Sequence, residues 1–478
     1  MYCQLDALRH CFPSSVRRTL KEIPESLDET YERIVMDIKK GIRVHAYRML
    51  QCMAVAIRPL SVEELAELLA LDFDGATEGI PRLHTDWRWQ DHEQAVLSTC
   101  SSLITVVANN SRARVVQFSH FSVKEFLLSG RLAMATSDVS DYHIVLEDAN
   151  TVLAQACVGV LLRDPVDQDV ADGISLTRYA AKHWVAHAQA ENVASRIRNG
   201  IQHLLDPTGS HFSAWVQSHD VHYAPLVDDF QNVIQPEAAP LYSAAFCGLD
   251  EVVTVLALEN PRNASAIGGG CGTAMHAAAV QGHLQVVRSL IQCGVDANVR
   301  GLYGWTPLHF ASWWGSVDVV RYLLDHGAYV DARDDLKATA LCAAATRGLL
   351  DIVRLLLDHH ADANSRYCGG RTPLHGASAD DLSKGDHAEV VGLLLKHGAN
   401  PNARDDDRRT PLHLVPSSKP DVACVLLEHG ADVDAEDKEG NIGYERPGRQ
   451  GERARELERD TSSDARQTNI TQESLGKR

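Results

Sequence analysis

The feature that most constrains the fold of this chain is a four-residue phrase, Thr-Pro-Leu-His in its clearest form, that returns at a fixed interval. Copies begin at Thr273, Thr306, Thr339, Thr372 and Thr410. The first three steps are 33 residues each, and the last is 38 because residues 380–386 carry an insertion. A weaker copy begins at Ala239. A fixed period of this length indicates a repeat protein, in which each unit buries its apolar face only against its neighbours.

The remainder of the unit repeats as well. After Thr306 come the pairs Val319-Val320 and Leu323-Leu324, a spacing that builds a broad apolar stripe on one face of a helix. Gly327 follows, where a glycine can end a helix in the left-handed conformation. In the next copy His360 replaces that glycine, which costs ~1 kcal/mol if its φ is positive.

The phrase, the apolar pairs, the glycine and the period together resemble the ankyrin repeat family. The resemblance covers five copies and implies that Thr and His of each phrase form hydrogen bonds across neighbouring repeats. Cys342 replaces that histidine in one copy, which puts its hydrogen bond in doubt. The last copy is one residue short and contains Pro416 and Pro420, so its first helix should fray.

Members of the ankyrin family bind protein partners through their turn tips and concave helix ends. Carried over to this sequence, the resemblance predicts a site of seven residues: Leu302, Tyr303, Trp305, Trp313, Trp314, Arg347 and Arg371. Exposed aromatic anchors dominate interface energies, so we expect the first five to contact the partner. The alternative is that they pack on adjacent repeats or on the N-terminal half. The charged tip at 405–409 is expected to be a solvated turn.

The first half of the chain is not repetitive. Capping boxes at Ser26–Glu29 and Ser61–Glu64 predict two helix starts. Strand-like runs at 103–107 and 114–118 flank a polar turn and precede a helix near Phe121. Helices followed by a small hairpin and another helix are typical of a winged-helix arrangement.

Phrases at 27–34, 58–66 and 118–127 resemble the region that follows the NTPase core of fungal NACHT-type (STAND) signal-transduction NTPases. The segment 179–187 is similar to the helical arm that follows there. The resemblance implies a regulatory spacer and not a DNA-binding module. The helix expected at 62–71 also argues against DNA binding, because its glutamates Glu63, Glu64 and Glu67 would repel phosphate.

The sequence gives no support for a catalytic or metal site. The nucleotide-binding pattern G-x-x-x-x-G-K-[ST] is missing, and the glycine-rich loop 268–273 lacks its Lys and lies in a repeat turn. His183 and His187 have a metal-compatible spacing, but no third ligand is evident and we expect them to pack. No serine lies in a G-x-S-x-G elbow. We expect no enzyme activity, no cofactor and no bound metal.

Charge and composition narrow the partners. A formal net charge of -18 argues against nucleic acid, which binds to surplus Lys and Arg. No leader is visible at Met1, and the apolar stretches fall short of the ~20 residues that cross a bilayer. The 11 cysteines lack regular spacing and suit reduced thiols. We expect a cytoplasmic protein without membrane contact, with the nucleus as an open alternative.

These observations predict a mostly α fold, an ankyrin-repeat solenoid preceded by a helical and winged-helix domain and a helical arm. The expected divisions are 1–135 for the regulatory domain, 136–238 for the arm, 239–440 for about six repeats and 441–478 for a disordered charged tail. The expected function is a non-enzymatic scaffold or adaptor in signalling or regulation. The alternative is a truncated signal-transduction NTPase whose nucleotide-binding core lies upstream of this chain.

Overall fold

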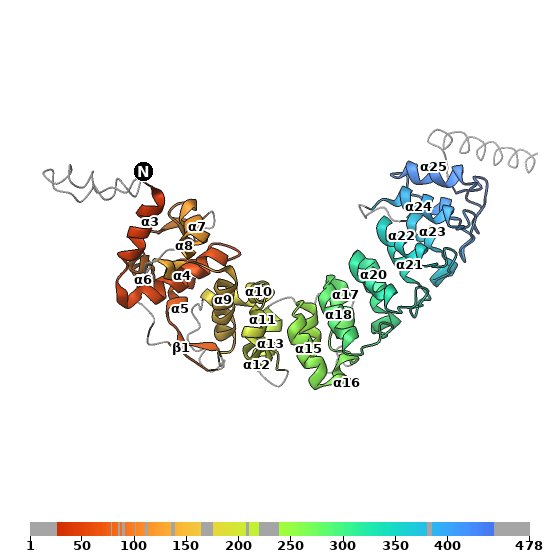
Figure 1. The fold of residues 1–478 in the computed structure, drawn as a ribbon. Helices are drawn as coiled ribbons and strands as arrows, with labels where there is room; N and C mark the ends of the chain where they lie inside the picture. The colour runs from red at the N-terminus through yellow and green to blue at the C-terminus, as the bar shows by residue number, and fades with distance from the viewer. Residues whose placement is uncertain are drawn as a thin grey trace, which may run out of the picture. The chain divides into compact units, whose positions relative to one another are not determined.

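The computed structural model describes residues 26–77, 79–84, 87, 91–100, 102–109, 113–134, 139–163, 175–206, 210–218, 239–379 and 385–443. The tail expected to be disordered lies outside the described residues from 444 onward. The described chain is mainly helical (Figure 1). It forms two compact units. The first takes in the described residues up to Ala278 together with Arg288–Gly294, and the second takes in Ala279–Val287 and those from Val295.

The first unit begins with the winged-helix region. Its elements are α3 (Leu27–Met36), η1 (Lys40–Ile42), α4 (Arg43–Val55), α5 (Val62–Leu69), β1 (Leu71–Thr77), β2 (Ile80–Leu83), α6 (His92–Cys100), β3 (Ile104–Ala108), β4 (Arg114–Phe118), α7 (Phe121–Leu127) and α8 (Gly130–Ala133). The predicted hairpin is confirmed: β3 and β4 pair antiparallel, with Ile104 opposite Phe118. Ser61 adds a short bridge to Val115 at the edge of β4.

The two predicted helix starts are present. At α5, Ser61 Oγ accepts from Glu64 N and the Glu64 side chain returns a hydrogen bond to Ser61 N, which completes the capping box. At α3, Glu29 N donates to Ser26 Oγ at 3.2 Å. These bonds satisfy backbone N–H groups that the first turn of a helix leaves without partners.

The arm follows in the same unit. It consists of η3 (Ser140–Tyr142), α9 (Leu146–Leu161), α10 (Ser175–Ala188), α11 (Val193–Arg196), α12 (Arg198–Leu204) and α13 (Ser210–Ser218). Helix α9 lies at its centre and packs on α4, α10 and β2. Trp184 and Trp215 are buried and meet edge to face, with ring centroids 5.4 Å apart. The arm therefore shares one core with the winged-helix region.

The first unit also holds the first repeats. These contain α14 (Ala239–Phe246), α15 (Asp250–Glu259) and α16 (Pro261–Ala264), followed by α17 (Ala274–Gln281) and α18 (Leu284–Gln292), which lie partly in each unit. Gln189, just after α10, donates to the Cys247 carbonyl at 2.7 Å and joins the arm to α14. The glycine-rich loop is a tight turn, as predicted, with Gly268 N donating to Gly272 O at 2.9 Å.

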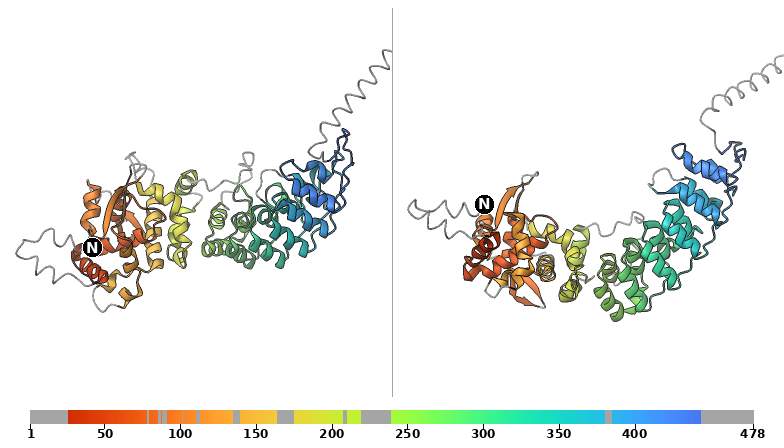
Figure 2. Two further views of the ribbon diagram at one scale, coloured as in Figure 1. Left: turned by 90° about the horizontal axis from the view of Figure 1, so that it is seen from above. Right: turned by 45° about the horizontal axis from the view of Figure 1, so that its top comes forward.

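The second unit consists of regular repeats. Its elements are η6 (Leu302–Gly304), α19 (Pro307–Trp314), α20 (Val317–Asp325), α21 (Ala340–Thr346), α22 (Leu350–Asp358), η7 (Cys368–Gly370), α23 (Pro373–Ala379), α24 (His387–Lys396), η8 (Pro411–Leu414) and α25 (Pro420–Glu428). Helices α19, α21 and α23 pack in one row, and α20, α22, α24 and α25 in another. Figure 2 shows the helices of successive repeats side by side in chain order.

The phrase residues bind the repeats to one another. Thr306 N and Oγ1 lie 3.2 and 2.8 Å from His309 Nδ1, and His309 Nε2 lies 3.0 Å from Ala338 O in the next copy. Because Nδ1 accepts the backbone N–H, Nε2 carries the proton and the ring is neutral. His375 repeats the arrangement, with Arg409 O at 3.1 Å. The histidine crosses between copies as expected, whereas the threonine bonds to the histidine of its own copy.

The three departures from the repeat pattern, two of them in the copy that begins at Thr339, behave as the sequence predicts. Cys342 Sγ meets Thr339 Oγ1 at 3.4 Å and Ser365 Oγ at 3.7 Å, so a weak sulfur contact replaces the carbonyl bond. His360 has a φ of 63°, in the left-handed region. In the last copy, η8 is a single short 3-10 turn in place of an α-helix.

Candidate functional site

Five of the seven predicted site residues lie at the surface of two neighbouring copies in the second unit. Tyr303 sits in η6 with a φ of 56°, and Trp305 directly precedes the helix cap Thr306. Trp313 and Trp314 occupy the last turn of α19, which ends at Gly315 in the left-handed conformation. Arg347 is the C-cap of α21 in the following copy. We call Tyr303, Trp305, Trp313, Trp314 and Arg347 the aromatic patch.

Contacts within the patch hold Trp305, Trp313 and Arg347 in place. The rings of Trp305 and Trp313 meet edge to face with centroids 6.2 Å apart, and Trp305 also packs on Phe310 at 4.8 Å. The Arg347 guanidinium lies 5.3 Å from the centre of the Trp313 ring, a cation–π contact. Tyr303 and Trp314 remain 43% and 44% exposed. The patch is therefore an ordered surface with exposed aromatic area.

Leu302 does not belong to this surface. It is only 6% exposed, because the 3-10 turn η6 places it in the core while Tyr303 remains outside. The expectation for Leu302 was wrong. By contrast, Leu336 stands at the position equivalent to Tyr303 and is 60% exposed. The tips are joined by a hydrogen bond of 3.0 Å from Asp335 N to Tyr303 O. The register of the copies points to Leu336 as well, but the predicted site left it out.

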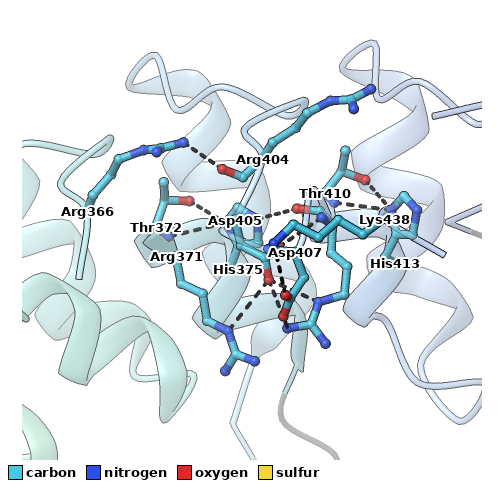
Figure 3. A network of polar contacts seen from close by, with 11 residues as sticks. Arg366, Arg371, Thr372, His375, Arg404, Asp405, Asp407, Thr410, His413 and Lys438 are labelled. Atoms are coloured by element: carbon cyan, nitrogen blue, oxygen red, sulfur yellow. Dashed lines mark hydrogen bonds and ion pairs between the residues drawn. The ribbon is translucent and has the colours of Figure 1, made fainter. Parts of the chain in front are cut away.

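Arg371 belongs to a separate polar network at the 405–409 turn (Figure 3). Its Nε lies 3.9 Å from Asp405 Oδ2, which also accepts from Arg409 Nε at 3.0 Å. Asp405 Oδ1 accepts from the backbone N–H groups of Asp407 and Arg409. The Asp405 side chain is 1% exposed. This turn was expected to be solvated throughout, but its central carboxylate is buried and structural because it satisfies these N–H groups.

The acidic helix of the winged-helix region is a packing element. Glu64 is buried and accepts from Arg58 Nη1 at 2.8 Å, and Glu67 is buried and accepts from Leu176 N at 2.9 Å. Of the three glutamates of α5 that we expected to repel phosphate, only Glu63 is exposed. Helix α6, directly before the β3–β4 hairpin, contains no lysine or arginine.

His187 has the packing role that its sequence context predicted. Its Nε2 lies 2.8 Å from Tyr179 Oη and its Nδ1 lies 2.9 Å from Asn150 Oδ1. Tyr179 Oη also accepts from Ile57 N at 3.1 Å. Burial, with a smaller contribution from His183, lowers the pKa of His187 to about 4. Within the described parts of the chain, no group of three or more His, Cys, Asp or Glu side chains could hold a metal ion.

The buried thiols are poor nucleophiles. Burial raises the pKa of Cys100 and Cys247 to about 12, and it raises those of Cys52 and Cys157 as well. A thiol reacts through its thiolate form, which is scarce at neutral pH in such surroundings.

Over the residues that the structure covers, no helix is both long and apolar enough to cross a membrane.

Comparison with known proteins agrees with this architecture. Three copies of the ankyrin repeats description match residues 241–334, 330–405 and 381–437. The winged helix domain of GPI inositol-deacylase matches residues 31–140. The "Azaphilone pigments biosynthesis cluster protein L" of Monascus ruber is 29% identical over 296 residues, which are 58% of this chain and 61% of that protein. The chain thus spans 61% of the length of this relative. It combines a winged-helix domain with ankyrin repeats. The ankyrin repeats support a role in protein interaction.

Proposed function

We propose that the chain is a non-enzymatic scaffold that captures a protein partner through the aromatic patch. The exposure of Tyr303 and Trp314 beside the half-buried Trp305 and Trp313 carries this proposal. The patch contains three of the seven tryptophans of the chain, and tryptophan is enriched among the residues that dominate interface energies. The wider role that we propose is in signalling or regulation within the cytoplasm.

The internal contacts of the patch favour binding. A side chain that is free in solution loses rotamer entropy when a partner immobilises it, at roughly 0.5–1.5 kcal/mol each. Trp313 is already fixed between Trp305 and Arg347. The partner therefore gains apolar contact area without ordering that ring. Arg347 adds a positive charge at the rim, which favours a partner with a carboxylate next to its apolar contact residues.

The test replaces Trp305, Trp313 and Trp314 by alanine in the full chain. Affinity purification with the wild type and the variant, compared by quantitative mass spectrometry, should show a set of partners that the variant loses. Proteins of the biosynthesis cluster named for the Monascus ruber relative suggest where to look first, among the products of neighbouring genes. Tyr329→Ala is the matched control, because Tyr329 is 70% exposed outside the patch.

Measuring the stability of the variants distinguishes a binding surface from a packed core. Trp314→Ala should unfold in urea close to the wild-type midpoint, because Trp314 is 44% exposed. The triple variant should lose some stability, because Trp305 packs on the buried Phe310 and on Trp313. Trp314→Ala alone provides a milder probe if the triple variant is poorly folded. Retention of every partner by both variants, or a large loss of stability in Trp314→Ala, would contradict the proposal.

A second candidate is that this chain is the C-terminal part of a signal-transduction NTPase of the NACHT or STAND type. The match of residues 31–140 to a winged helix domain supports it, together with the arm phrase at 179–187. The genomic sequence upstream of Met1 tests this candidate. An in-frame G-x-x-x-x-G-K-[ST] motif would support it, and stop codons in that frame with no such motif would refute it.

A further inference from the structure

A row of arginines occupies one position of the repeat in the second unit. Arg300, Arg333, Arg366 and Arg404 each stand six residues before the threonine of the phrase that follows. The steps between them are 33, 33 and 38 residues, so the insertion before α24 lengthens the last step without changing the register. The same structural position is therefore basic in four successive copies. We call these four residues the arginine row.

Two members of the row, Arg366 and Arg404, reach carbonyl groups of the next copy. Arg366 Nη2 donates to Arg404 O at 2.6 Å, and Arg404 Nη1 donates to Glu436 O at 3.4 Å. In Figure 3, Arg366 and Arg404 extend away from the side of the turn on which Arg371 meets Asp405. A guanidinium has five N–H donors, so each keeps several for an external acceptor while its position is fixed.

Three of the four charges have no carboxylate partner. In the described part of the chain, Arg333, Arg366 and Arg404 form no ion pair, whereas Arg300 meets Asp335 at 3.3 Å. The chain as a whole has 64 acidic and 46 basic residues, so acidic side chains are not scarce.

A second pair of arginines provides a comparison on the helices. Arg321 on α20 lies three residues after Asp318 and four before Asp325, and Arg354 on α22 has the same surroundings in Asp351 and Asp358. Among the described residues Arg321 and Arg354 form no ion pair either. The two sets therefore differ in place and not in pairing: the arginine row lies on the non-helical segments between successive copies, where Arg333 and Arg366 are exposed.

We propose that the arginine row binds an extended acidic segment of a protein partner, with a carboxylate at every third residue. Packed helices lie about 8–10 Å apart, which sets the approximate spacing from one repeat to the next. Three residues of extended or polyproline chain span about 9–10 Å. Carboxylates at this interval can each meet one guanidinium, which binds carboxylate in a bidentate manner.

A peptide fits this surface better than a nucleic acid. A nucleic acid carries a phosphate at every nucleotide and would also meet the exposed Asp335 and Asp406 that flank the row. The formal net charge of -18 repels a long polyanion further. A peptide with spaced carboxylates avoids placing charge against these aspartates. This surface and its ligand are separate from the aromatic patch.

The experiment measures binding of a fluorescein-labelled twelve-residue peptide to the full chain by fluorescence anisotropy. The peptide has glutamate at every third position with serine and proline between, and its control has the same composition with the glutamates consecutive. We expect the spaced peptide to bind more tightly than the control. Arg333→Gln with Arg366→Gln should weaken that binding about tenfold, since each removes one charge-assisted contact.

Arg321→Gln with Arg354→Gln is the matched control, because it removes two charges from the same two repeats. It should bind the spaced peptide like the wild type, as should the triple tryptophan variant of the proposed function. Equal weakening by both arginine pairs would overturn the proposal in favour of a net-charge effect. So would failure of the spaced peptide to bind at millimolar concentration, or tighter binding of a twelve-residue oligothymidylate that depends on Arg333 and Arg366.

Discussion

His360 lies where a repeat of this kind uses glycine. Its φ is 63°, while Gly327, Gly398 and Gly430 at the equivalent positions have values of 89°, 84° and 84°. The residue that faces His360 from the preceding copy also departs from the repeat pattern. Asn298, Asn364 and Asn402 each donate from Nδ2 to the carbonyl of the equivalent glycine at 2.9 Å. Asp331 holds the corresponding position opposite His360 and has no N–H to donate.

His360→Gly should therefore raise the free energy of unfolding by about 1 kcal/mol, because the left-handed conformation no longer strains a side chain. Adding Asp331→Asn should contribute roughly a further 0.5–1.5 kcal/mol by restoring the hydrogen bond. Urea unfolding of the full chain measures both. His359→Gly is the control: its φ is -88°, so glycine there should not stabilise. An equal effect of the two glycines would refute the backbone explanation.

At the scale of elements, the repeat helices could be predicted because the period, the apolar pairs and the glycines agree in most of the copies. The β1–β2 hairpin and α6 could not. Strand β1 contains Asp and Gly, which disfavour strands, and the buried face of α6 consists of small or weakly apolar residues such as Ala95 and Thr99. Their positions depend on packing against α9 and α5.

The candidate site, too, could be predicted only in part from the sequence. The sequence located Tyr303 and the three tryptophans by their register in the repeat, and the structure finds them at the surface or partly exposed. It could not reveal that Leu302, one residue away, is buried, because that depends on the geometry of a 3-10 turn. Nor could it reveal the stacking of Arg347 on Trp313, which joins two copies. The arginine row, however, was readable by aligning the copies on their threonines.

Helix α5 offers a test of an element that is held by one side chain. Glu64 caps the helix through Ser61 N and also binds Arg58, and it is buried. Glu64→Ala should lower the free energy of unfolding by about 3 kcal/mol, because the cap and the ion pair are lost together. Glu63→Ala, on the exposed side of the same helix, should change it by less than about 0.5 kcal/mol. Comparable changes of the two variants in urea unfolding would show that the cap and the ion pair of Glu64 do not stabilise the helix.

At the scale of the whole molecule, both units depend on neutral histidines. His187 joins α9 and α10 in the first unit, and His309 and His375 join copies in the second. Burial lowers the pKa of His309 and His375, and it lowers that of His187 to about 4. Each ring accepts a hydrogen bond at one nitrogen and donates at the other, so protonation removes an acceptor that its neighbour needs.

Acid should therefore destabilise the chain well above the range in which carboxylates titrate. An unfolded histidine has a pKa of about 6.5, so between pH 6.5 and 4 the unfolded state binds protons that folded His187 does not. The contribution of His187 is complete above pH 6.5 and is lost as the pH falls towards 4, by up to about 3 kcal/mol. Urea unfolding at several pH values measures it. His187→Gln should flatten part of the decline, whereas His45→Gln, at an exposed position on α4, should leave the slope unchanged. A wild-type stability that is constant from pH 7 to 4.5, or a slope that His187→Gln does not alter, would show that the ring is not held neutral by its network.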